Sequence, residues 1–373
     1  RGEIAVRIIR ACHELGLQTV AIYSEGDKDA LHTQIADEAY CVGPTQSKDS
    51  YLNIANILSI ATSTGCDGVH PGYGFLAENG DFAELCEACQ LQFIGPNYES
   101  IQKMGIKDIA KAEMIKANVP VVPGSEGLIQ SIDDAKKTAK KIGYPVIIKA
   151  TAGGGGKGIR VARDEKELET GYRMTQQEAE TAFGNGGLYL EKFIENFRHI
   201  EIQIIGDTYG NVIHLGERDC TIQRRMQKLV EEAPSPVLSE DKRQEMGNAA
   251  IRAAKAVNYE NAGTIEFIYD LDDNQFYFME MNTRIQVEHP VTEMVTGVDL
   301  VKLQLKVAMG EALPFKQEDI SINGHAIEFR INAENPYKNF MPSPGKITQY
   351  LAPGGFGVRI ESACYTNYTI PPY

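Results

Sequence analysis

Basic charge and long apolar runs are both scarce in this sequence. No stretch approaches the roughly 18 consecutive apolar residues that a membrane-spanning helix needs. The 37 lysines and arginines are outnumbered by 51 aspartates and glutamates, which gives a net charge of −14 and an isoelectric point of about 5.1. General binders of nucleic acids or anionic membranes carry the opposite balance. We therefore expect no nucleic-acid or membrane partner, and an anionic ligand must be bound by a local cluster of Lys, Arg and backbone N–H groups.

Cysteine is also sparse, and the motifs of several enzyme classes are missing. The seven cysteines are scattered and odd in number, which favours free thiols and a cytoplasmic location. Cys86 and Cys89 have no second pair at zinc-ligand spacing, so we expect both to pack on one apolar helix face with Phe82 and Leu85. No G-x-S-x-G supports a serine hydrolase, and no H-E-x-x-H supports a zinc protease.

The length and composition indicate a globular protein of two or three domains. The chain has 373 residues, of which 43% are hydrophobic and 24% charged, so disordered and fibrous proteins are excluded. We expect both ends to be clipped. The sequence starts at Arg1 inside a helical pattern, with no signal-peptide h-region, and it stops at Tyr373 with no terminating pattern.

The first hundred residues alternate helix-period and strand-period segments. Helices are predicted at residues 4–15, 51–63 and 82–89, and strands at residues 18–23, 67–70 and 92–94. Alternating βα units imply a parallel sheet covered by helices on both faces. The pattern predicts a Rossmann-like domain over residues 1–96, followed by a helical linker over residues 97–120. The first βα unit also suggests a dinucleotide-binding oxidoreductase, although it lacks that class's glycine fingerprint.

The rest of the chain reads as an α+β protein with antiparallel hairpins. Helices are predicted at residues 165–182, 239–257 and 292–309. The strands are predicted at residues 145–150, 158–162, 187–193, 199–205, 212–215, 264–269, 276–281, 325–331 and 346–351.

Residues 151–158 form a glycine-rich loop between two predicted strands, with Lys149 before it and Lys157 inside it. Glycine tolerates positive φ and lets backbone N–H groups approach a phosphate closely. The loop is not a P-loop, because no Ser or Thr follows the lysine and a strand comes next. Its shortness favours a mobile flap over phosphates, and a flexible linker remains the alternative.

Acidic and amide side chains gather in the segment that follows residue 278. In an extended strand Glu280 and every second residue through Glu288 point to one face, while Met279 and its counterparts point to a core. A hairpin centred on Asp273 places Glu266 opposite Glu280. Two opposed carboxylates repel each other, but a hard cation such as Mg²⁺ bound between them makes the arrangement favourable. The pattern predicts a metal–nucleotide site, and a solvated face of paired charges remains the alternative.

Residues 217–228 are basic and polar. A surface loop, a local pocket for a small anion and an RNA-binding arm are three interpretations of this segment. The net negative charge of the chain disfavours the RNA-binding arm. The other two interpretations stay open.

Taken together, five segments resemble the biotin carboxylase family in order along the whole chain. They are residues 1–5 (RGEIA), 70–75 (HPGYGF), the glycine loop, 218–225 (RDCTIQRR) and 280–290 (EMNTRIQVEHP). The resemblance implies an α/β and α+β fold, with a Rossmann-like N-terminal domain followed by an ATP-grasp fold and its mobile glycine lid. The implied domains after the linker are an ATP-grasp lid subdomain at residues 121–193, an ATP-grasp core at 194–320 and an incomplete C-terminal domain at 321–373. It also implies a strand before Arg1, further chain beyond Tyr373, and a histidine where this sequence has Met226.

The resemblance also implies a role for each matching residue. ATP is expected to contact Lys107, Lys149, Gly155, Gly156, Glu191, Lys192, Ile194, His199, Gln223, Glu266, Ile268 and Glu280. Two Mg²⁺ (or Mn²⁺) ions are expected at Glu266, Glu280 and Asn282. Bicarbonate is expected among Lys228, Arg284, Gln286, Val287 and Glu288, and the biotin ureido oxygen at Arg330. Lys228, Arg284, Glu288 and Arg330 are the expected catalytic residues.

In the reaction that the resemblance implies, a bicarbonate oxygen attacks the γ-phosphate of ATP while Glu288 takes the proton of bicarbonate. The carboxyphosphate formed breaks down to CO₂ and phosphate, and the phosphate deprotonates biotin. The expected partners are biotin carboxyl carrier protein, carboxyltransferase subunits and a second copy of the chain. Acetyl-CoA carboxylase is the expected assembly. The alternatives are a pyruvate or other acyl-CoA carboxylase, another ATP-grasp ligase such as the carbamoyl phosphate synthetase large chain, and a non-catalytic ATP sensor.

Overall fold

The computed structural model describes residues 2–150, 159–183 and 186–372. The chain forms two compact units. The larger unit contains residues 1–119, 199–266 and 280–373, and the smaller unit contains residues 120–198 and 267–279. Among the described residues, no helix has both the length and the apolar character needed to cross a membrane.

The N-terminal part of the larger unit alternates helices with short parallel strands. Its elements are α1 (Gly2–Glu14), β1 (Val20–Ser24), α2 (Leu31–Ile35), β2 (Glu38–Gly43), α3 (Ile54–Ser63), β3 (Gly68–Val69), α4 (Gly80–Ala88) and β4 (Gln92–Phe93). Strand β1 pairs with β2 and β3 pairs with β4, both in parallel. Val42, Leu58, Phe82 and Phe93 form part of the core beneath these strands. The predicted parallel α/β arrangement is confirmed, in the form of two two-stranded sheets, and β2 is a strand that the sequence did not predict.

Helix α4 corrects one expectation about the cysteines. Phe82 and Cys86 are buried as predicted, but Leu85 and Cys89 are exposed. The helix ends at Ala88, so Cys89 lies beyond the last helical residue and the helical period no longer places it on the buried face. All seven cysteines are free thiols, as predicted.

Helices α5 (Tyr98–Gly105) and α6 (Lys107–Lys116) follow within the predicted linker. The Asn97 side chain accepts a hydrogen bond from the backbone N–H of Ser100 and so caps α5. The smaller unit begins after these helices.

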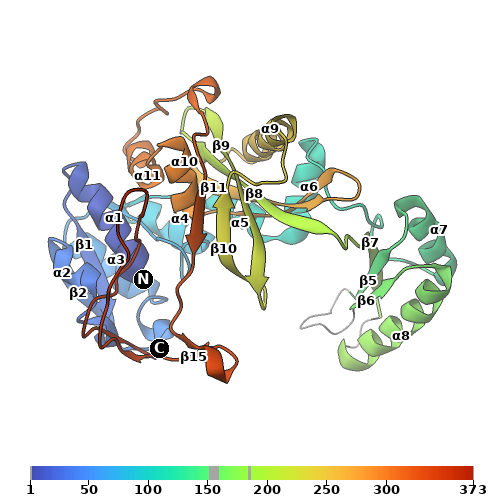
Figure 1. Cartoon of the computed structure of the whole chain (residues 1–373), viewed down its shortest axis with the longest axis horizontal. Coiled ribbons are helices and arrows are strands. Elements are labelled where there is room, and N and C mark those ends of the chain that lie inside the picture. Colours follow the sequence, from blue (N-terminus) through green and yellow to red (C-terminus); the bar gives the residue numbers. More distant parts are fainter. Residues whose placement is uncertain (1, 151–158, 184–185, 373) are drawn as a thin grey trace. The chain divides into compact units, whose positions relative to one another are not determined.

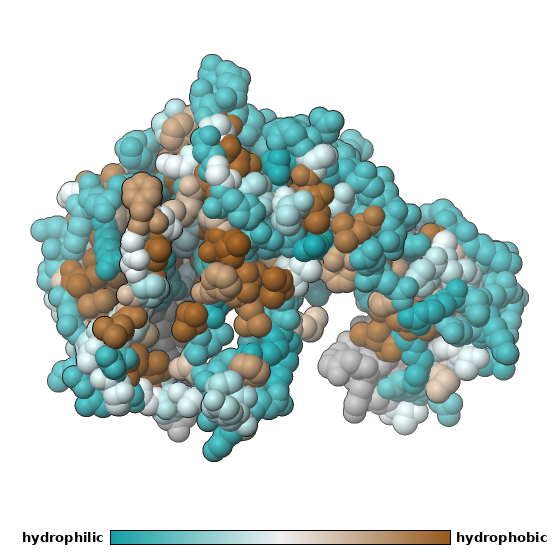
Figure 2. Space-filling model, viewed as in Figure 1, coloured by the Kyte–Doolittle hydropathy of each residue, from teal (hydrophilic) through white to brown (hydrophobic). Residues whose placement is uncertain are grey.

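The described residues of the smaller unit include a three-stranded antiparallel sheet and two helices (Figure 1). Its elements are α7 (Ile132–Ile142), β5 (Val146–Ala150), β6 (Ile159–Ala162), α8 (Glu165–Phe183) and β7 (Leu188–Lys192), with the sheet order β6-β5-β7. Ala135, Ile148, Leu168 and Leu190 are buried in its core. The outer surface of α7 and α8 is mostly hydrophilic, as amphipathic helices on a sheet require (Figure 2).

A six-stranded sheet carries most of the residues that matter below (Figure 1). Its strands are β8 (Phe197–Gly206), β9 (Val212–Arg224), β10 (Gln227–Ala233), β11 (Asn261–Asp270), β12 (Gln275–Asn282) and β13 (Ala326–Phe329), in the order β12-β11-β8-β9-β10-β13. Strand pairs β8–β9, β9–β10 and β10–β13 are antiparallel. Residues 217–228 therefore belong mainly to a β-hairpin rather than to a loop.

Helix α9 (Glu240–Ala256) packs on β9, and α10 (His289–Thr296) packs on β9, β10 and β13. Helix α11 (Leu300–Ala308) follows. The single helix predicted over residues 292–309 is thus wrong. Gly297 adopts the left-handed conformation at φ 72° and ends α10, so α10 and α11 are separate helices.

Three further expectations about strands are corrected. Strand β12 ends at Asn282, so residues 283–288 form a bend and a turn, and strand alternation does not place them. Met279 is 40% exposed rather than part of a core. The short strands β14 (Glu334–Asn335), β15 (Met341–Pro342), β16 (Gly345–Lys346) and β17 (Thr369–Ile370) complete the larger unit, and only the first residue of the strand predicted at 346–351 is in a strand.

Candidate active site

One largely buried cation, Lys228, lies among three carboxylates in the larger unit, with 13% of its side chain exposed. Its Nζ atom on β10 is 2.5 Å from Glu201 Oε2 on β8, 2.8 Å from Glu266 Oε1 on β11, and 2.8 Å from Glu288 Oε1 at the start of α10. Burial alone lowers the pKa of a lysine, but these carboxylates raise the pKa of Lys228 well above its usual value. Lys228 is therefore a fixed positive charge and neither accepts nor releases a proton.

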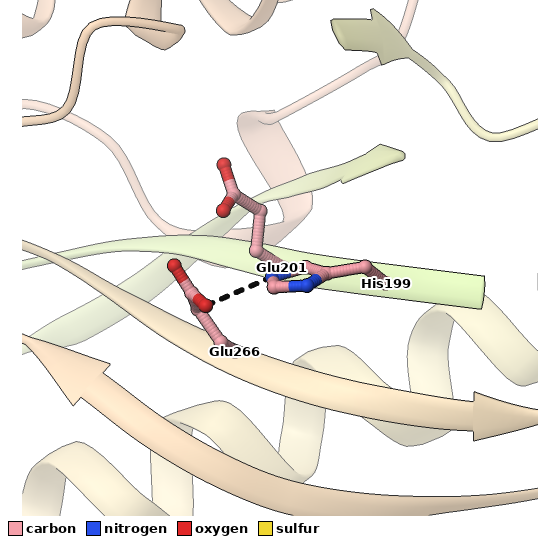
Figure 3. A group of neighbouring side chains, drawn as sticks. All are labelled: His199, Glu201 and Glu266. Carbon is pink, nitrogen blue, oxygen red and sulfur yellow. Dashed lines mark ion pairs between the residues drawn. The ribbon is translucent and has the colours of Figure 1, made fainter. Parts of the chain in front are cut away.

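Glu266 is the most densely hydrogen-bonded of these carboxylates. Besides Lys228, it contacts His199 Nε2 at 2.8 Å, Asn282 Nδ2 at 2.7 Å and Gln286 Nε2 at 3.1 Å. Figure 3 shows His199 directed at Glu266, with Glu201 beside them on the same strand as His199. Burial favours the neutral acid, yet His199 and Lys228 lower the pKa of Glu266 to about 2. Glu266 is thus ionised at neutral pH.

Glu201 and Arg218 support this cluster from within the protein, and no role was predicted for either residue. The Arg218 side chain is fully buried, and its Nε donates to Glu201 Oε1 at 2.5 Å. Its terminal nitrogens donate to Gln286 Oε1 at 2.8 Å and to Thr292 Oγ1 at 2.9 Å. Glu201 is the only acidic residue in the mainly apolar strand predicted at residues 199–205, and this position could have marked it as a functional residue. Arg218 fixes both Glu201 and Gln286, and through Glu201 it orients Lys228.

Glu288 lies between two cations. Lys228 Nζ donates to Glu288 Oε1, and Arg330 Nη2 donates to Glu288 Oε2 at 2.9 Å. Glu288 is only 2% exposed. Glu288 is also the N-cap residue of α10, where the helix dipole favours a negative charge. These contacts hold the Glu288 carboxyl group in one place.

Arg284 and Glu280 lie at the more exposed side of the cluster. Arg284 donates to Glu78 Oε2 and to Asn282 Oδ1, each at 3.0 Å, and Glu78 is a partner that no motif predicted. Strands β11 and β12 are neighbours, as the predicted hairpin requires. Burial, followed by the nearby Glu266, raises the pKa of Glu280, whereas Lys107 opposes the shift. This destabilised negative charge is what a bound cation would relieve.

Among the described residues, two groups bring three metal-ligating atoms within 4.8 Å of one another. They are His199, Glu201 and Glu266, and Glu201, Cys220 and Glu288. Lys228 contacts carboxylates of both groups, so a lysine already supplies positive charge there. Only Glu266 is shared with the predicted metal ligands.

The remaining predicted residues are placed as follows. In the larger unit Gln223 Nε2 is 3.2 Å from His199 Nδ1, Val287 is half-buried beside Glu288, and Lys107 is an exposed residue at the start of α6. In the smaller unit Lys149 pairs with Glu191, Lys192 Nζ donates to the carbonyl of Tyr144, and Ile194 is buried, with Ile268 half-buried. Gly155 and Gly156 and the predicted flap lie outside the described residues.

Three family models match the chain in sequence order. Residues 1–101 match the biotin carboxylase N-terminal domain. Residues 107–316 match the ATP binding domain of the carbamoyl-phosphate synthase L chain, and residues 328–373 match the biotin carboxylase C-terminal domain.

Individual proteins agree with these models. Biotin carboxylase 1 of Bacillus subtilis is 67% identical over 373 residues, covering all of this chain and 83% of that protein. The 2-oxoglutarate carboxylase small subunit of Hydrogenobacter thermophilus is 57% identical, covering all of this chain and 79% of that protein.

Solved structures give the same result. The biotin carboxylase domain of a thermophilic 2-oxoglutarate carboxylase bound to ADP superposes with a TM-score of 0.94 at 56% identity, and the match covers 82% of that structure. The Hydrogenobacter thermophilus domain dimer, in complex with MgADP, ADP and bicarbonate, gives 0.85 at 56% identity and the same coverage. Both matches cover this whole chain.

Proposed function

This chain belongs to the biotin carboxylase family, an ATP-grasp family of ATP-dependent ligases, and from this premise we propose that it carboxylates biotin on a biotin carboxyl carrier protein. The observation that carries the proposal is the position of Glu288, held between Lys228 and Arg330. A carboxylate base with one cation on each side suits a reaction in which one anionic intermediate follows another, because each cation can neutralise developing negative charge.

Glu288 is the general base of the first step. It takes the proton of bicarbonate as a bicarbonate oxygen attacks the γ-phosphorus of ATP, and ADP leaves. Lys228 neutralises negative charge that develops on the reacting anions, because its raised pKa keeps it protonated throughout. Arg284, anchored on Glu78 and Asn282, provides a second cation for the anions.

Arg330 serves the second step. Carboxyphosphate breaks down to CO₂ and phosphate, and phosphate removes the proton from the biotin nitrogen that then attacks CO₂. The negative charge that forms on the ureido oxygen needs a fixed donor, and a guanidinium stays protonated under all working conditions. Contacts with Glu231 and Glu288 fix the orientation of Arg330.

Glu266, Glu280 and Asn282 fit a divalent cation, since they offer oxygen atoms. Burial and the nearby Glu266 raise the pKa of Glu280, and a bound cation would oppose this shift. When bound, Mg²⁺ (or Mn²⁺) supplies charge neutralisation to the phosphates of ATP. This proposal also assigns ten further residues to nucleotide binding. They are Lys107, His199, Gln223, Lys149, Gly155, Gly156, Glu191, Lys192, Ile194 and Ile268.

We further propose that the reaction is the first half-reaction of an acetyl-CoA carboxylase in fatty acid synthesis. The partners would then be the carrier protein and carboxyltransferase subunits, with a cytoplasmic homodimer of this chain. The match to a 2-oxoglutarate carboxylase subunit favours an alternative in which the final acceptor is a 2-oxo acid. Flanking biotin carboxylase domains on both sides of the ATP-binding match disfavour other ATP-grasp ligases.

Steady-state release of ADP tests the proposal. Turnover should require Mg²⁺ and bicarbonate, and free biotin should increase it with carboxybiotin as the product. Turnover that is unchanged when bicarbonate is removed would contradict the proposed function, and turnover without carboxybiotin would contradict its second step.

A further inference from the structure

Arg330 is anchored by a carboxylate that no motif marks. Glu231, on β10, is fully buried, and its Oε1 accepts a hydrogen bond from Arg330 Nε at 2.7 Å. The other side of the guanidinium donates to Glu288 Oε2 at 2.9 Å. The backbone N–H of Arg330 also donates to the carbonyl of Leu229 on β10 at 3.0 Å. Both the side chain and the backbone of Arg330 are thus attached to β10.

A second carboxyl group faces this anchor. The antiparallel register of β10 and β13 places Glu328 directly opposite Glu231. In the described part of the chain, Glu231 Oε2 and Glu328 Oε2 are both buried and neither has a hydrogen-bond partner. Two ionised carboxylates at such positions repel, and each unpaired buried oxygen costs free energy. One proton removes the repulsion, because a neutral carboxyl can donate to a carboxylate.

The charges around the pair agree with a retained proton. Burial first, then Glu231 and Glu288, raise the pKa of Glu328 to about 9. Burial also raises the pKa of Glu231 to about 7, although the contact with Arg330 opposes the shift. The other charged groups that act on the pair are Glu3, on α1, and Glu201, on β8. At neutral pH the pair therefore holds at least one proton.

We propose that Glu231 and Glu328 share one proton and together position Arg330 for biotin, with Glu231 as the anchor. This inference rests on the proposed function, because it concerns the residue assigned to the ureido oxygen. Loss of the shared proton adds a negative charge behind the guanidinium. That charge draws Arg330 away from Glu288 and from biotin, so ATP cleavage becomes uncoupled from carboxylation at high pH.

The ratio of carboxybiotin formed to ADP released, measured against pH, reports this positioning. In the wild type the ratio should fall as pH rises through about 9. Glu328→Gln keeps a neutral hydrogen-bonding group at all pH values, so its ratio should stay flat. Glu231→Gln weakens the anchor and should raise KM for biotin about ten- to a hundredfold, with bicarbonate-dependent ADP release retained. Glu232→Gln, on the same strand but bonded to His325, is the matched control.

Infrared spectroscopy tests the proton without any need for turnover. Wild-type protein at neutral pH should show a protonated carboxyl band that Glu328→Gln weakens and Glu232→Gln leaves unchanged, because Glu3 also has a pKa raised to about 7 and contributes to the band in all three proteins. Wild-type protein with no biotin-dependent turnover would refute the proposed function. An active wild type whose pH profile matches that of Glu328→Gln, or a carboxyl band that this substitution does not weaken, would instead refute the shared proton.

Discussion

Replacing Lys228 with methionine removes the charge that holds three buried carboxylates together. The side chains of Glu201, Glu266 and Glu288 are at most 5% exposed, so none of them can turn to water for compensation. Removing one partner of a buried ion pair costs about 3–5 kcal/mol. The displacement of the Glu266 pKa from 4.5 to about 2 corresponds to about 3 kcal/mol, of the same order. We expect Lys228→Met to lower the free energy of unfolding of the larger unit by about 3–5 kcal/mol at neutral pH, or its thermal midpoint by about 10 °C.

The loss should depend on pH in a defined direction. In the wild type Glu201 and Glu266 have depressed pKa values, so their contribution is present above their unfolded pKa and is lost only as pH falls towards about 2. Without Lys228, both pKa values rise above those of the wild type, because burial is then opposed only in part, by Arg218 at Glu201 and by His199 at Glu266. The folded variant therefore binds protons at a higher pH than the folded wild type. The stability difference between wild type and variant should therefore shrink as pH falls from 7.5 to 4.5.

Thermal unfolding at a series of pH values measures this difference. Lys48→Met is the matched control, because Lys48 has a carboxylate neighbour at 3.9 Å but is 72% exposed. An exposed pair contributes about 0–1 kcal/mol, so the control should change little. A Lys228 variant with the thermal midpoint of the control, or with a deficit that grows on acidification, would refute the account of the cluster.

Three further substitutions separate the steps of the reaction. Glu280→Gln removes a carboxylate proposed to bind the metal, so turnover should fall about a hundredfold or more at low Mg²⁺ and recover in part at high Mg²⁺; full activity at low Mg²⁺ would contradict the assignment. Glu288→Gln should retain ATP binding but lower bicarbonate-dependent ADP release by about a hundred- to ten-thousandfold, which a smaller loss would contradict. Arg330→Ala should release ADP with little carboxybiotin, and a normal ratio of the two products would exclude contact with the ureido oxygen.

The sequence predicted those parts of the fold that local patterns control. Helix and strand periods located α1, α3, α9, β5, β7 and β8 within a few residues. The helix break at Gly297 was not predicted, because the apolar period continues through this residue. Only the left-handed φ of Gly297 separates α10 from α11. Strand β2 was missed because, at its positions 38–43, only Val42 is buried and the alternation is weak.

For the candidate site, the sequence predicted several of the residues correctly but not the structural elements that position them. Glu266, Asn282, Gln286 and Glu288 stand in a recognisable order along the chain, and the structure brings them around Lys228. The prediction that strand alternation positions Glu288 was wrong, because a turn and the start of α10 position it instead.

The supporting residues could not be predicted from local patterns. Glu78 and Arg284 are 206 positions apart, and Glu231 and Arg330 are 99 positions apart. Contacts of this kind depend on tertiary packing and leave no short-range pattern in a single sequence.

Transfer of oxygen from bicarbonate to phosphate tests the central claim most directly. If a bicarbonate oxygen attacks the γ-phosphorus, that oxygen remains on phosphate when carboxyphosphate breaks down. Turnover in [¹⁸O]bicarbonate, stopped before the label exchanges with water, should therefore yield inorganic phosphate that carries one ¹⁸O atom for each ADP released. Phosphate without the label would show that water attacks ATP, and it would contradict the role proposed for Glu288 and the carboxyphosphate route.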